Sequence, residues 1–544
     1  MSGWAQRGLD RLLRSSPSSR MAESLGAGSS VLAVSAERGV ELVHPASSSD
    51  PVQLHASGTT ASATPDGTIV IVATTSTLEV FSLSPPSSPS WTASASLPAK
   101  PSALSSTSHH AICFVPPGTN RNGSILTFSL PSLHPTGSLH AKKASYPMLS
   151  FSLPDENVCA RHESDELCVY RSNAVGDKNQ AARLLAQHAA AASMSPDGKH
   201  AAVFNPEKKS MPASAKIHAL PEFGSGKTEM QPLAMRTFYR AKTASLLWSP
   251  SSVSCVVWAA SDVDATNKSY YGESGMHVVR PDGNGQRVEV EKEGPVHDVS
   301  WSPAGDTFIS VQGYLPTPAV CVHDMFGNKK QKVLNDSFNG VAWNRFGNFV
   351  ALYGFGNLPG DITFLDKKPD GKLKTFASTR MRSHTALEWL ADGRHLAISA
   401  LTPRIREGNG FMIMKYNGEQ VFDKRYNELT AVCSVGMSEE DASQFNRPPS
   451  PSAKQNRAKG SAEKSEANTY RPAHLKNVQP LPTQQGSFSS DAYKPPKQRE
   501  EAEGPPGSEG MNLGGGQTKN AKKRERQKKK KQEAGEANGY GGAS

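Results

Sequence analysis

The sequence predicts an all-β protein, a β-propeller followed by a long, basic, disordered C-terminal tail. A short turn motif recurs along the chain at a nearly constant spacing, and a short apolar run follows most copies. A third observation is compositional: after about residue 439 the apolar pattern stops and polar and basic residues dominate. Repeats of roughly 40–50 residues in an all-β pattern are typical of propeller blades.

The recurring turn reads Ser/Thr-Pro-Asp-Gly in its clearest copies. Pro presets the first turn dihedral and Gly accepts a positive one, so each copy predicts a tight hairpin turn. A degenerate copy near residues 106–108 divides the first long interval in two, which gives eight turn positions. A further strand at residues 428–435 would supply a ninth blade, so we expect nine blades in all. The other copies begin at Thr64, Leu153, Ser195, Ser249, Ser302, Asn344 and Leu390.

The segments between turns have the pattern of antiparallel strands. Residues 78–83 and 167–170 follow the period of two that is expected of half-buried antiparallel strands. The alanine-rich stretch 181–192 is compatible either with a helix or with a connection inside a blade. The sequence does not show how the ring closes, although in many propellers the first and last segments share a blade.

Charge and composition divide the chain into four parts. Residues 441–544 contain 19 Lys and Arg against 11 Asp and Glu, so they carry most of the formal net charge of +10. Segments rich in Pro, Ser, Gln and Gly bury too little apolar surface to offset the entropy of ordering. We therefore expect a disordered extension at 1–30, the propeller at 31–438, a disordered linker at 439–518 and a basic tail at 519–544.

Three further features bear on the cellular compartment of the protein. Residues 1–21 are rich in Arg and Ser, which suits either a disordered extension or a transit peptide. The six cysteines lack a CxxC or CxxH spacing, which favours a reduced cytosolic interior over a metal or disulfide role. No run of 18 apolar residues is present, so no membrane span or membrane partner is expected.

The chain shows no recognisable catalytic motif. Residues 223–228 suggest a phosphate-binding P-loop, but Pro221 stands where the first glycine is required and Gln231-Pro232 opposes the helix that should follow. The sequence contains no GxSxG, HExxH or DxDxDG motif. We therefore expect a protein that is not an enzyme and uses no metal or other cofactor.

Several stretches are more specific than the repeat. They lie at residues 261–273, 294–301, 354–366, 402–411 and 469–472. Their order and spacing resemble the eukaryotic translation initiation factor 2A family, a WD-repeat family, from about residue 50 to about residue 476. The first 30 residues look unlike the family. Members often continue beyond a basic run, here at residues 519–531, into a charged helix, so a partner bound by that helix is in doubt here.

The resemblance implies a WD40-like propeller of nine blades and a cytoplasmic role in translation. It implies binding to the small (40S) ribosomal subunit and delivery of initiator methionyl-tRNA to that subunit for selected mRNAs, without GTP. Other initiation factors are further candidate partners. Two alternatives stay open: a scaffold like the propeller subunit of initiation factor 3, and a nuclear adaptor whose basic run is a localisation signal.

Candidate functional residues fall into three groups. The basic run suits phosphate backbones, since Lys and Arg bind them through counterion release; a solvated tail or nuclear signal is the alternative. Tyr270, Tyr271, Arg404 and Arg406 suit RNA stacking and backbone contacts, although loop packing explains them equally well. Tyr470, Arg471 and Pro472 form a candidate docking motif. The basic run comprises Lys519, Lys522, Lys523, Arg524, Arg526, Lys528, Lys529, Lys530 and Lys531.

Four tryptophans stand just before successive turns, at matching positions of their repeats. Matching positions in successive blades indicate a shared structural role, so we expect these rings to pack between blades. They are Trp248, Trp301, Trp343 and Trp389.

Overall fold

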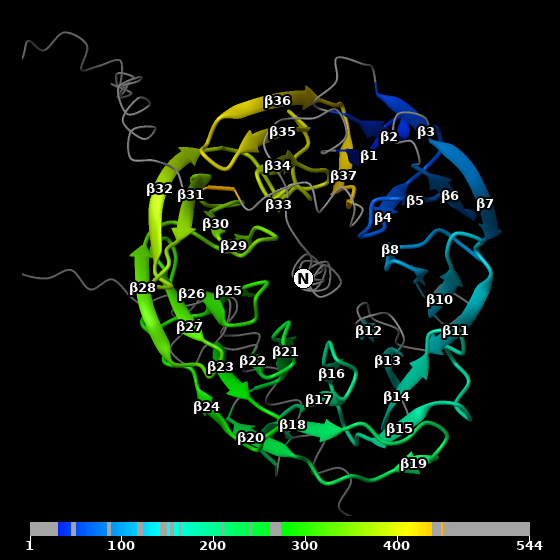
Figure 1. The fold of residues 1–544 in the computed structure, drawn as a ribbon, viewed down its shortest axis with the longest axis vertical. Helices are drawn as coiled ribbons and strands as arrows, with labels where there is room; N and C mark the ends of the chain where they lie inside the picture. The colour runs from blue at the N-terminus through cyan, green and yellow to red at the C-terminus, as the bar shows by residue number, and fades with distance from the viewer. Residues whose placement is uncertain are drawn as a thin grey trace, which may run out of the picture. The chain divides into compact units, whose positions relative to one another are not determined.

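A computed structural model shows a ring of nine β-sheets, antiparallel except for one added two-residue strand (Figure 1). Across the described residues there are 37 strands and no helix, which confirms the predicted all-β propeller of nine blades. The described residues are 31–44, 51–83, 89–116, 123–141, 149–152, 157–162, 165–208, 211–239, 241–261, 274–437 and 448–449.

Each blade is named here by its strands, in chain order. Blade 1 is β37 (Leu429–Ser434), β1 (Leu32–Ala36), β2 (Gly39–Val43) and β3 (Val52–His55); blade 2 is β4 (Thr60–Ala63), β5 (Ile69–Ala73), β6 (Thr77–Ser82) and β7 (Ser90–Ser96); blade 3 is β8 (Ala103–Ser106), β9 (His110–Val115), β10 (Gly123–Ser129) and β11 (Pro135–Ala141). Blade 4 is β12 (Leu149–Phe151), β13 (Asn157–His162), β14 (Glu166–Arg171) and β15 (Ala182–Leu185), with β19 (Lys227–Thr228) added; blade 5 is β16 (Ala191–Met194), β17 (His200–Asn205), β18 (Ala213–Ala219) and β20 (Ala234–Phe238); blade 6 is β21 (Thr243–Trp248), β22 (Cys255–Ala260), β23 (Ser274–Val279) and β24 (Gly285–Arg287). Blade 7 is β25 (Val296–Trp301), β26 (Thr307–Gln312), β27 (Ala319–Asp324) and β28 (Lys329–Asn335); blade 8 is β29 (Gly340–Trp343), β30 (Phe349–Tyr353), β31 (Asp361–Lys367) and β32 (Leu373–Arg380); blade 9 is β33 (Ala386–Trp389), β34 (His395–Ala400), β35 (Gly410–Lys415) and β36 (Gln420–Arg425).

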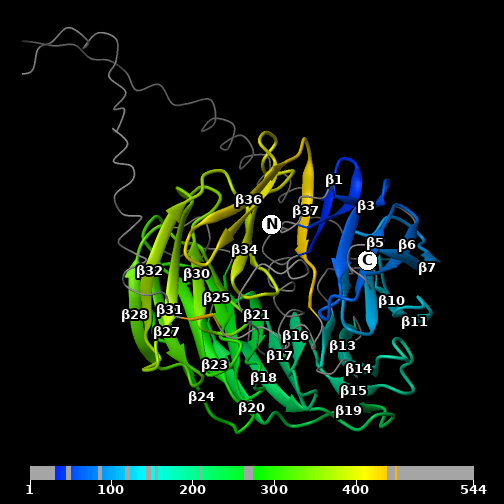
Figure 2. The ribbon, with the colours of Figure 1, turned by 45° about the horizontal axis from the view of Figure 1, so that its top comes forward.

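The ring closes in blade 1, where the last strand joins the first. β37 pairs with β1 in antiparallel register, from Leu32 opposite Ser434 to Ala36 opposite Leu429 (Figure 2). Segment 428–435, expected to complete a ninth blade, therefore does so as the innermost strand of the blade that opens the chain. This closure pairs the edge that each terminal segment would otherwise expose.

The antiparallel topology gives the propeller two faces. The turn face carries the connection from the first to the second strand of each blade, and the loop face carries the connection from the second to the third. The predicted turns lie on the turn face and are closed by backbone hydrogen bonds, such as Gly305 N to Ser302 O at 2.8 Å. Gly67, Gly198, Gly305 and Gly393 have φ between 65° and 73°, as their motif requires; the copy at 153–156 lies outside the described residues.

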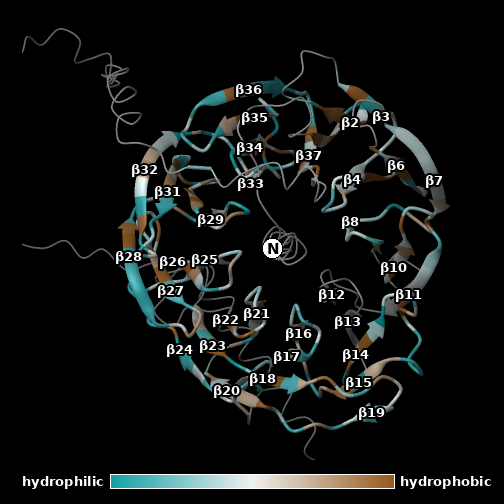
Figure 3. Ribbon diagram, viewed as in Figure 1, coloured by the Kyte–Doolittle hydropathy of each residue, from teal (hydrophilic) through white to brown (hydrophobic). Residues whose placement is uncertain are grey.

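The middle strands of the blades differ from the expected half-buried pattern. β9, β30 and β34 are buried at every position, because neighbouring blades cover both faces of each sheet. Alternation persists on outer strands such as β28 and β36, which are largely teal in Figure 3 while brown segments concentrate within the blades. Continuous apolar runs therefore mark the blade interior, as they do in sheets covered on both sides.

The four tryptophans connect successive blades, as predicted. Each indole N–H donates to a backbone carbonyl on the first strand of the preceding blade, and the ring packs between the two sheets. Ser106 occupies the same strand end in blade 3 and donates to Ala63 O at 2.9 Å. The indole bonds run from Trp248 to Ser193 O (3.2 Å), Trp301 to Leu247 O (3.0 Å), Trp343 to Ser300 O (3.3 Å) and Trp389 to Ala342 O (3.0 Å).

Two ambiguous segments are settled by the structure. Residues 181–192 form no helix; they contain β15, a turn and the start of β16, because β15 pairs with β14 and buries Ala182 and Leu184. Tertiary pairing thus overrides the helix propensity of alanine. Residues 223–228 lead into the two-residue strand β19, which pairs in parallel with β15. No helix follows within the described residues, so the segment lacks the geometry of a P-loop.

A buried carboxylate in the last of the recurring turns, the one that begins at Leu390, makes the stability of the propeller depend on pH. Asp392 is 2% exposed and lies 2.5 Å from His395 Nδ1. Burial opposes its ionisation, but hydrogen bonds from His395 and from the backbone N–H groups of Arg394 and His395 outweigh burial and hold the pKa of Asp392 below its usual value. The stabilisation is therefore complete above the unfolded-state pKa and is lost as the pH falls through the folded-state pKa.

We expect Asp392→Asn to lower the free energy of unfolding at neutral pH by about 1.5–3 kcal/mol, the range for hydrogen bonds to charged groups. The difference from the unchanged protein should shrink on acidification below about pH 4, near the unperturbed carboxyl pKa. Urea unfolding across a pH series measures both effects. Asp370→Asn, at a half-exposed turn carboxylate, is the control; an equal pH response in both variants would contradict the assignment.

Candidate nucleic-acid interface

Two of the sequence stretches that carry the family resemblance occupy the same position in neighbouring blades. Residues 354–360 connect β30 to β31, and residues 401–409 connect β34 to β35. Each is the connection from the second to the third strand of its blade and belongs to the loop face, whereas residues 262–273 lie outside the described residues. Loops on a rigid scaffold are where binding residues commonly lie.

The loops of blades 8 and 9 are in direct contact through Arg404. A Cβ placed on Gly356 would lie 2.2 Å from Arg404 Nη2, so the guanidinium lies against a glycine that leaves room for it. Gly356 and Gly360 have positive φ values of 83° and 91°, in the region that favours glycine. Gly354 is outside that region; glycine is needed there because a Cβ would lie 1.8 Å from Ser337 O.

Further hydrogen bonds bring two more arginines to the same place. Met381 N donates to Gly360 O at 2.7 Å, which fixes the connector from blade 8 to blade 9 against the blade 8 loop. Arg382 follows on this connector. From the end of β36, Arg425 Nη1 donates to Gly408 O at 3.2 Å. Contacts between neighbouring blades therefore gather residues far apart in the sequence.

We call Arg382, Arg404, Arg406 and Arg425 the arginine surface. All four are exposed, and the two loops with the connector contain one acidic residue, Glu407. Asp423 forms an ion pair with Arg425 at 3.3 Å. The four arginines still outnumber these two carboxylates, so the arginine surface has an excess of positive charge. Guanidinium groups bind phosphate oxygens in bidentate geometry and stack on bases, so this surface suits an RNA strand.

A histidine beneath the arginine surface agrees with its positive charge. His384 Nδ1 lies 2.7 Å from Arg382 O, and its ring is 6.3 Å from that of buried Phe355. Burial, and to a smaller extent the charge of Arg425, lower the pKa of His384. His384 is therefore neutral at pH 7, and the arginines supply the charge of the face.

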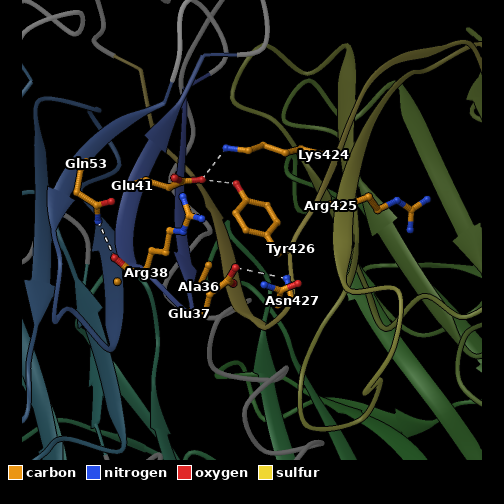
Figure 4. A pocket seen from close by; sticks show the side chains of 10 residues that line it. Ala36, Glu37, Arg38, Glu41, Gln53, Lys424, Arg425, Tyr426 and Asn427 are labelled. Carbon is orange, nitrogen blue, oxygen red and sulfur yellow. Dashed lines mark hydrogen bonds and ion pairs between the residues drawn. The ribbon is translucent and has the colours of Figure 1, made fainter.

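A pocket of about 360 Å³ opens beside the arginine surface, where blade 9 meets blade 1 (Figure 4). Glu41 on β2 accepts hydrogen bonds from Lys424 Nζ at 2.7 Å and from the hydroxyl of Tyr426. Burial, reinforced by Glu41, raises the pKa of Tyr426, so the phenol keeps its proton and donates. We call this the seam pocket; its lining residues are Ala36, Glu37, Arg38, Gly39, Glu41, Gln53, Lys424, Arg425, Tyr426 and Asn427.

Only part of the predicted site falls on described residues. Arg404 and Arg406 do, and Arg404 contributes both to loop packing and to an exposed basic surface. Tyr270 and Tyr271, the docking motif 470–472 and the basic run 519–531 lie outside the described residues, so their assignments stay predictions.

Sequence reasoning missed Arg382, Arg425 and the seam pocket. Arg382 lies against the blade 8 loop because Gly360 O accepts a hydrogen bond from the neighbouring residue Met381. The pocket forms between β2 and β36, which are nearly 400 positions apart in the chain. The sequence holds one signal for the two arginines, namely the number of arginines within the family-specific stretches and in the connectors beside them.

Features linked to other functions are limited in the described part of the chain. Cys113, Cys168, Cys255 and Cys321 are buried and form no disulfide, and burial raises the pKa of the Cys113 thiol to about 12. Over the described ranges, no group of three or more His, Cys, Asp or Glu side chains is arranged to hold a metal ion. Those same ranges contain no helix long and apolar enough to span a membrane.

We expect Gly356→Ala to weaken RNA binding by displacing Arg404. The added Cβ would collide with the guanidinium, and the positive φ would cost about 1–2 kcal/mol of stability. Gly371→Ala is the matched control, because Gly371 has a φ of 78° and open space around it. Thermal unfolding should show similar losses for both variants, whereas RNA affinity should fall only for Gly356→Ala; equal affinities would show that Arg404 is not placed by Gly356.

The arrangement was compared with known proteins. Residues 236–432, from blade 5 to blade 1, match the family model described as eukaryotic translation initiation factor eIF2A. Among curated proteins, eukaryotic translation initiation factor 2A of Schizosaccharomyces pombe is 30% identical over 277 residues, 51% of this chain and 46% of that protein. The Saccharomyces cerevisiae protein of the same name is 32% identical over 235 residues, 42% of this chain and 36% of that protein.

A solved structure described as a eukaryotic initiation factor covers 75% of this chain and 99% of its own, with a TM-score of 0.63 and 22% identity; it supports the fold. The Drosophila melanogaster relative is 29% identical over 51% of this chain and 42% of its own length. The chain thus spans about half the length of the curated relatives it matches, or less. The resemblance seen in the sequence is thus confirmed over residues 236–432, which are similar to the eukaryotic translation initiation factor 2A family.

Proposed function

We propose that this protein is a translation initiation factor that binds RNA of the small (40S) ribosomal subunit through the arginine surface. It directs initiator methionyl-tRNA to that subunit for selected mRNAs, without GTP and without catalysing a reaction, in the cytoplasm. The observation that carries the proposal is the arginine surface itself, which lies inside the family-matched residues. One family-specific loop supplies Arg404 and Arg406, the connector from blade 8 to blade 9 supplies Arg382, and the end of β36 supplies Arg425.

Charge distribution favours the loop face over the turn face for this role. On the turn face, the recurring turns use aspartates to close themselves, as Asp66 does with Thr68 N at 3.2 Å and Asp197 with Lys199 N at 3.2 Å. On the loop face over blades 8 and 9, arginines predominate. RNA phosphates are repelled by the first pattern and attracted by the second.

The basic run at 519–531 extends this proposal. A run of nine Lys and Arg with one Glu captures polyanions through counterion release and reads no sequence. The propeller face would then supply the oriented contact. Tyr270 and Tyr271, which lie outside the described residues, remain candidates for base stacking on the same RNA.

Binding of labelled initiator methionyl-tRNA to purified 40S subunits tests the delivery step. The protein should increase the tRNA retained with subunits on a filter, equally with GTP and with a non-hydrolysable GTP analogue or no nucleotide. A chain ending at Thr518 should retain the effect at low salt and lose it at moderate salt. Delivery that requires GTP, or no increase at any salt concentration, would contradict the proposal and favour the nuclear adaptor.

A further inference from the structure

We infer that the seam pocket receives an unpaired base of an RNA strand whose phosphates lie on the arginine surface. The inference deepens the proposed function, because it assigns a base-binding subsite to the same interface. It rests on the position of the pocket, on the charge inside it and on the groups that are left available.

The pocket and the arginine surface are continuous. Arg425 lines the pocket and also donates to Gly408 O in the blade 9 loop at 3.2 Å. The turn formed by Glu37 and Arg38, between β1 and β2, is on the loop face, as is the connection from β36 to β37 that contains Asn427. A strand lying along the arginines therefore passes the mouth of the pocket.

The charge inside the pocket suits a neutral ligand rather than a phosphate. Two carboxylates, Glu37 and Glu41, line it beside the cations of Arg38, Lys424 and Arg425. A phosphate placed inside would meet both carboxylates at close range, and like charges at short distance are strongly unfavourable. The open arginine surface offers the phosphate a better position, while a polar, uncharged base fits the pocket.

The carboxylates are already engaged, which leaves other groups for the ligand. Glu41 accepts from Lys424 and Tyr426, and Glu37 accepts from the backbone N–H of Glu428 at 3.2 Å. The amide nitrogen of Gln53 donates to Arg38 O at 2.9 Å and to Val40 O at 3.1 Å, so its N–H groups are engaged as well.

The groups that face the pocket match the edges of a base. The side-chain amide of Asn427 provides both a donor and an acceptor, which is the pattern needed to read a base edge. Arg38 lies in the pocket with an exposed side chain, and a planar guanidinium can stack on a splayed-out base. The volume of about 360 Å³ lies within the lower range of small-ligand sites.

A thermodynamic cycle tests the inference with the full-length protein. The probes are a short uridine-rich RNA and the same backbone with every base removed. Arg38→Ala combined with Asn427→Ala should weaken binding of the intact RNA about tenfold, the scale of one good base contact, and should leave binding of the abasic backbone unchanged. Arg287→Ala, at an exposed arginine on β24, should change neither; thermal unfolding checks that each variant is folded.

Photo-crosslinking supplies an independent readout. RNA containing 4-thiouridine should crosslink to residues 425–427 or to the turn at 37–38 after irradiation, and the double variant should lose those crosslinks. Equal losses for intact and abasic RNA, or crosslinks confined to other parts of the chain, would overturn the base-binding inference. If the unchanged protein binds neither RNA, the proposed function itself fails, so the two failures are distinguishable.

Discussion

Reversing Arg382, Arg404 and Arg406 to glutamate is expected to lower the affinity for single-stranded RNA by about 100-fold or more at low salt. Each guanidinium contributes a charge-assisted contact of about 1.5–3 kcal/mol, and each reversal adds repulsion. The slope of log affinity against log salt should become shallower by about one unit per lost phosphate contact. Fluorescence anisotropy over a salt series measures both quantities.

A matched control separates the location of the charge from its amount. Lys199, Arg287 and Lys374 are also exposed, and they lie on blades 5, 6 and 8 outside the arginine surface. Reversal of all three gives the same change in net charge. Both triple variants should keep stability close to that of the unchanged protein, because exposed substitutions usually change it by about 0.5 kcal/mol or less. Similar affinity losses in both would mean that the loop face has no special role.

A chain that ends at Asn427 is expected not to form a cooperatively folded propeller. It lacks β37, five residues of which pair with β1, and the side chain of Leu429, which is fully buried in a cluster with Leu32, Val34 and Phe411. Blade 1 would lose its innermost strand, and the ring would be left open. Leu429→Ala alone should cost about 2–5 kcal/mol, as large-to-small substitutions in a core do.

Denaturant unfolding followed by circular dichroism measures this effect. A chain ending at Pro449 retains β37 and should unfold with an unchanged midpoint. A peptide of residues 428–437, added to the shortened chain, should restore a cooperative transition by adding the missing strand. If the chain ending at Asn427 unfolds with the same midpoint and slope as the full chain, the ring is not held by β37.

The features set by local sequence could be predicted. The turn motif fixes dihedrals through Pro and Gly, and its repeat gave the number of blades. The four tryptophans were assigned to inter-blade packing because they share one position in the repeat. Each of these depends on residues close together in the chain, or on repetition, which a single sequence displays directly.

Features that depend on contacts between blades could not be predicted. The pairing of Leu429 with Ala36 joins the two ends of the propeller, and local sequence carries no signal for it. Helix propensity in residues 181–192 gave way to pairing with β14. The arginine surface combines residues from a connector, one loop and a strand end, and only the ring geometry brings these segments together.

The most direct test of the proposed interface is sedimentation of the full-length protein with purified 40S subunits through a sucrose gradient. The unchanged protein and the Lys199, Arg287 and Lys374 control should sediment with the subunits. The Arg382, Arg404 and Arg406 variant should remain in the light fractions at moderate salt. Equal sedimentation of all three proteins, or failure of the unchanged protein to bind at low salt, would contradict a ribosome contact through the arginine surface.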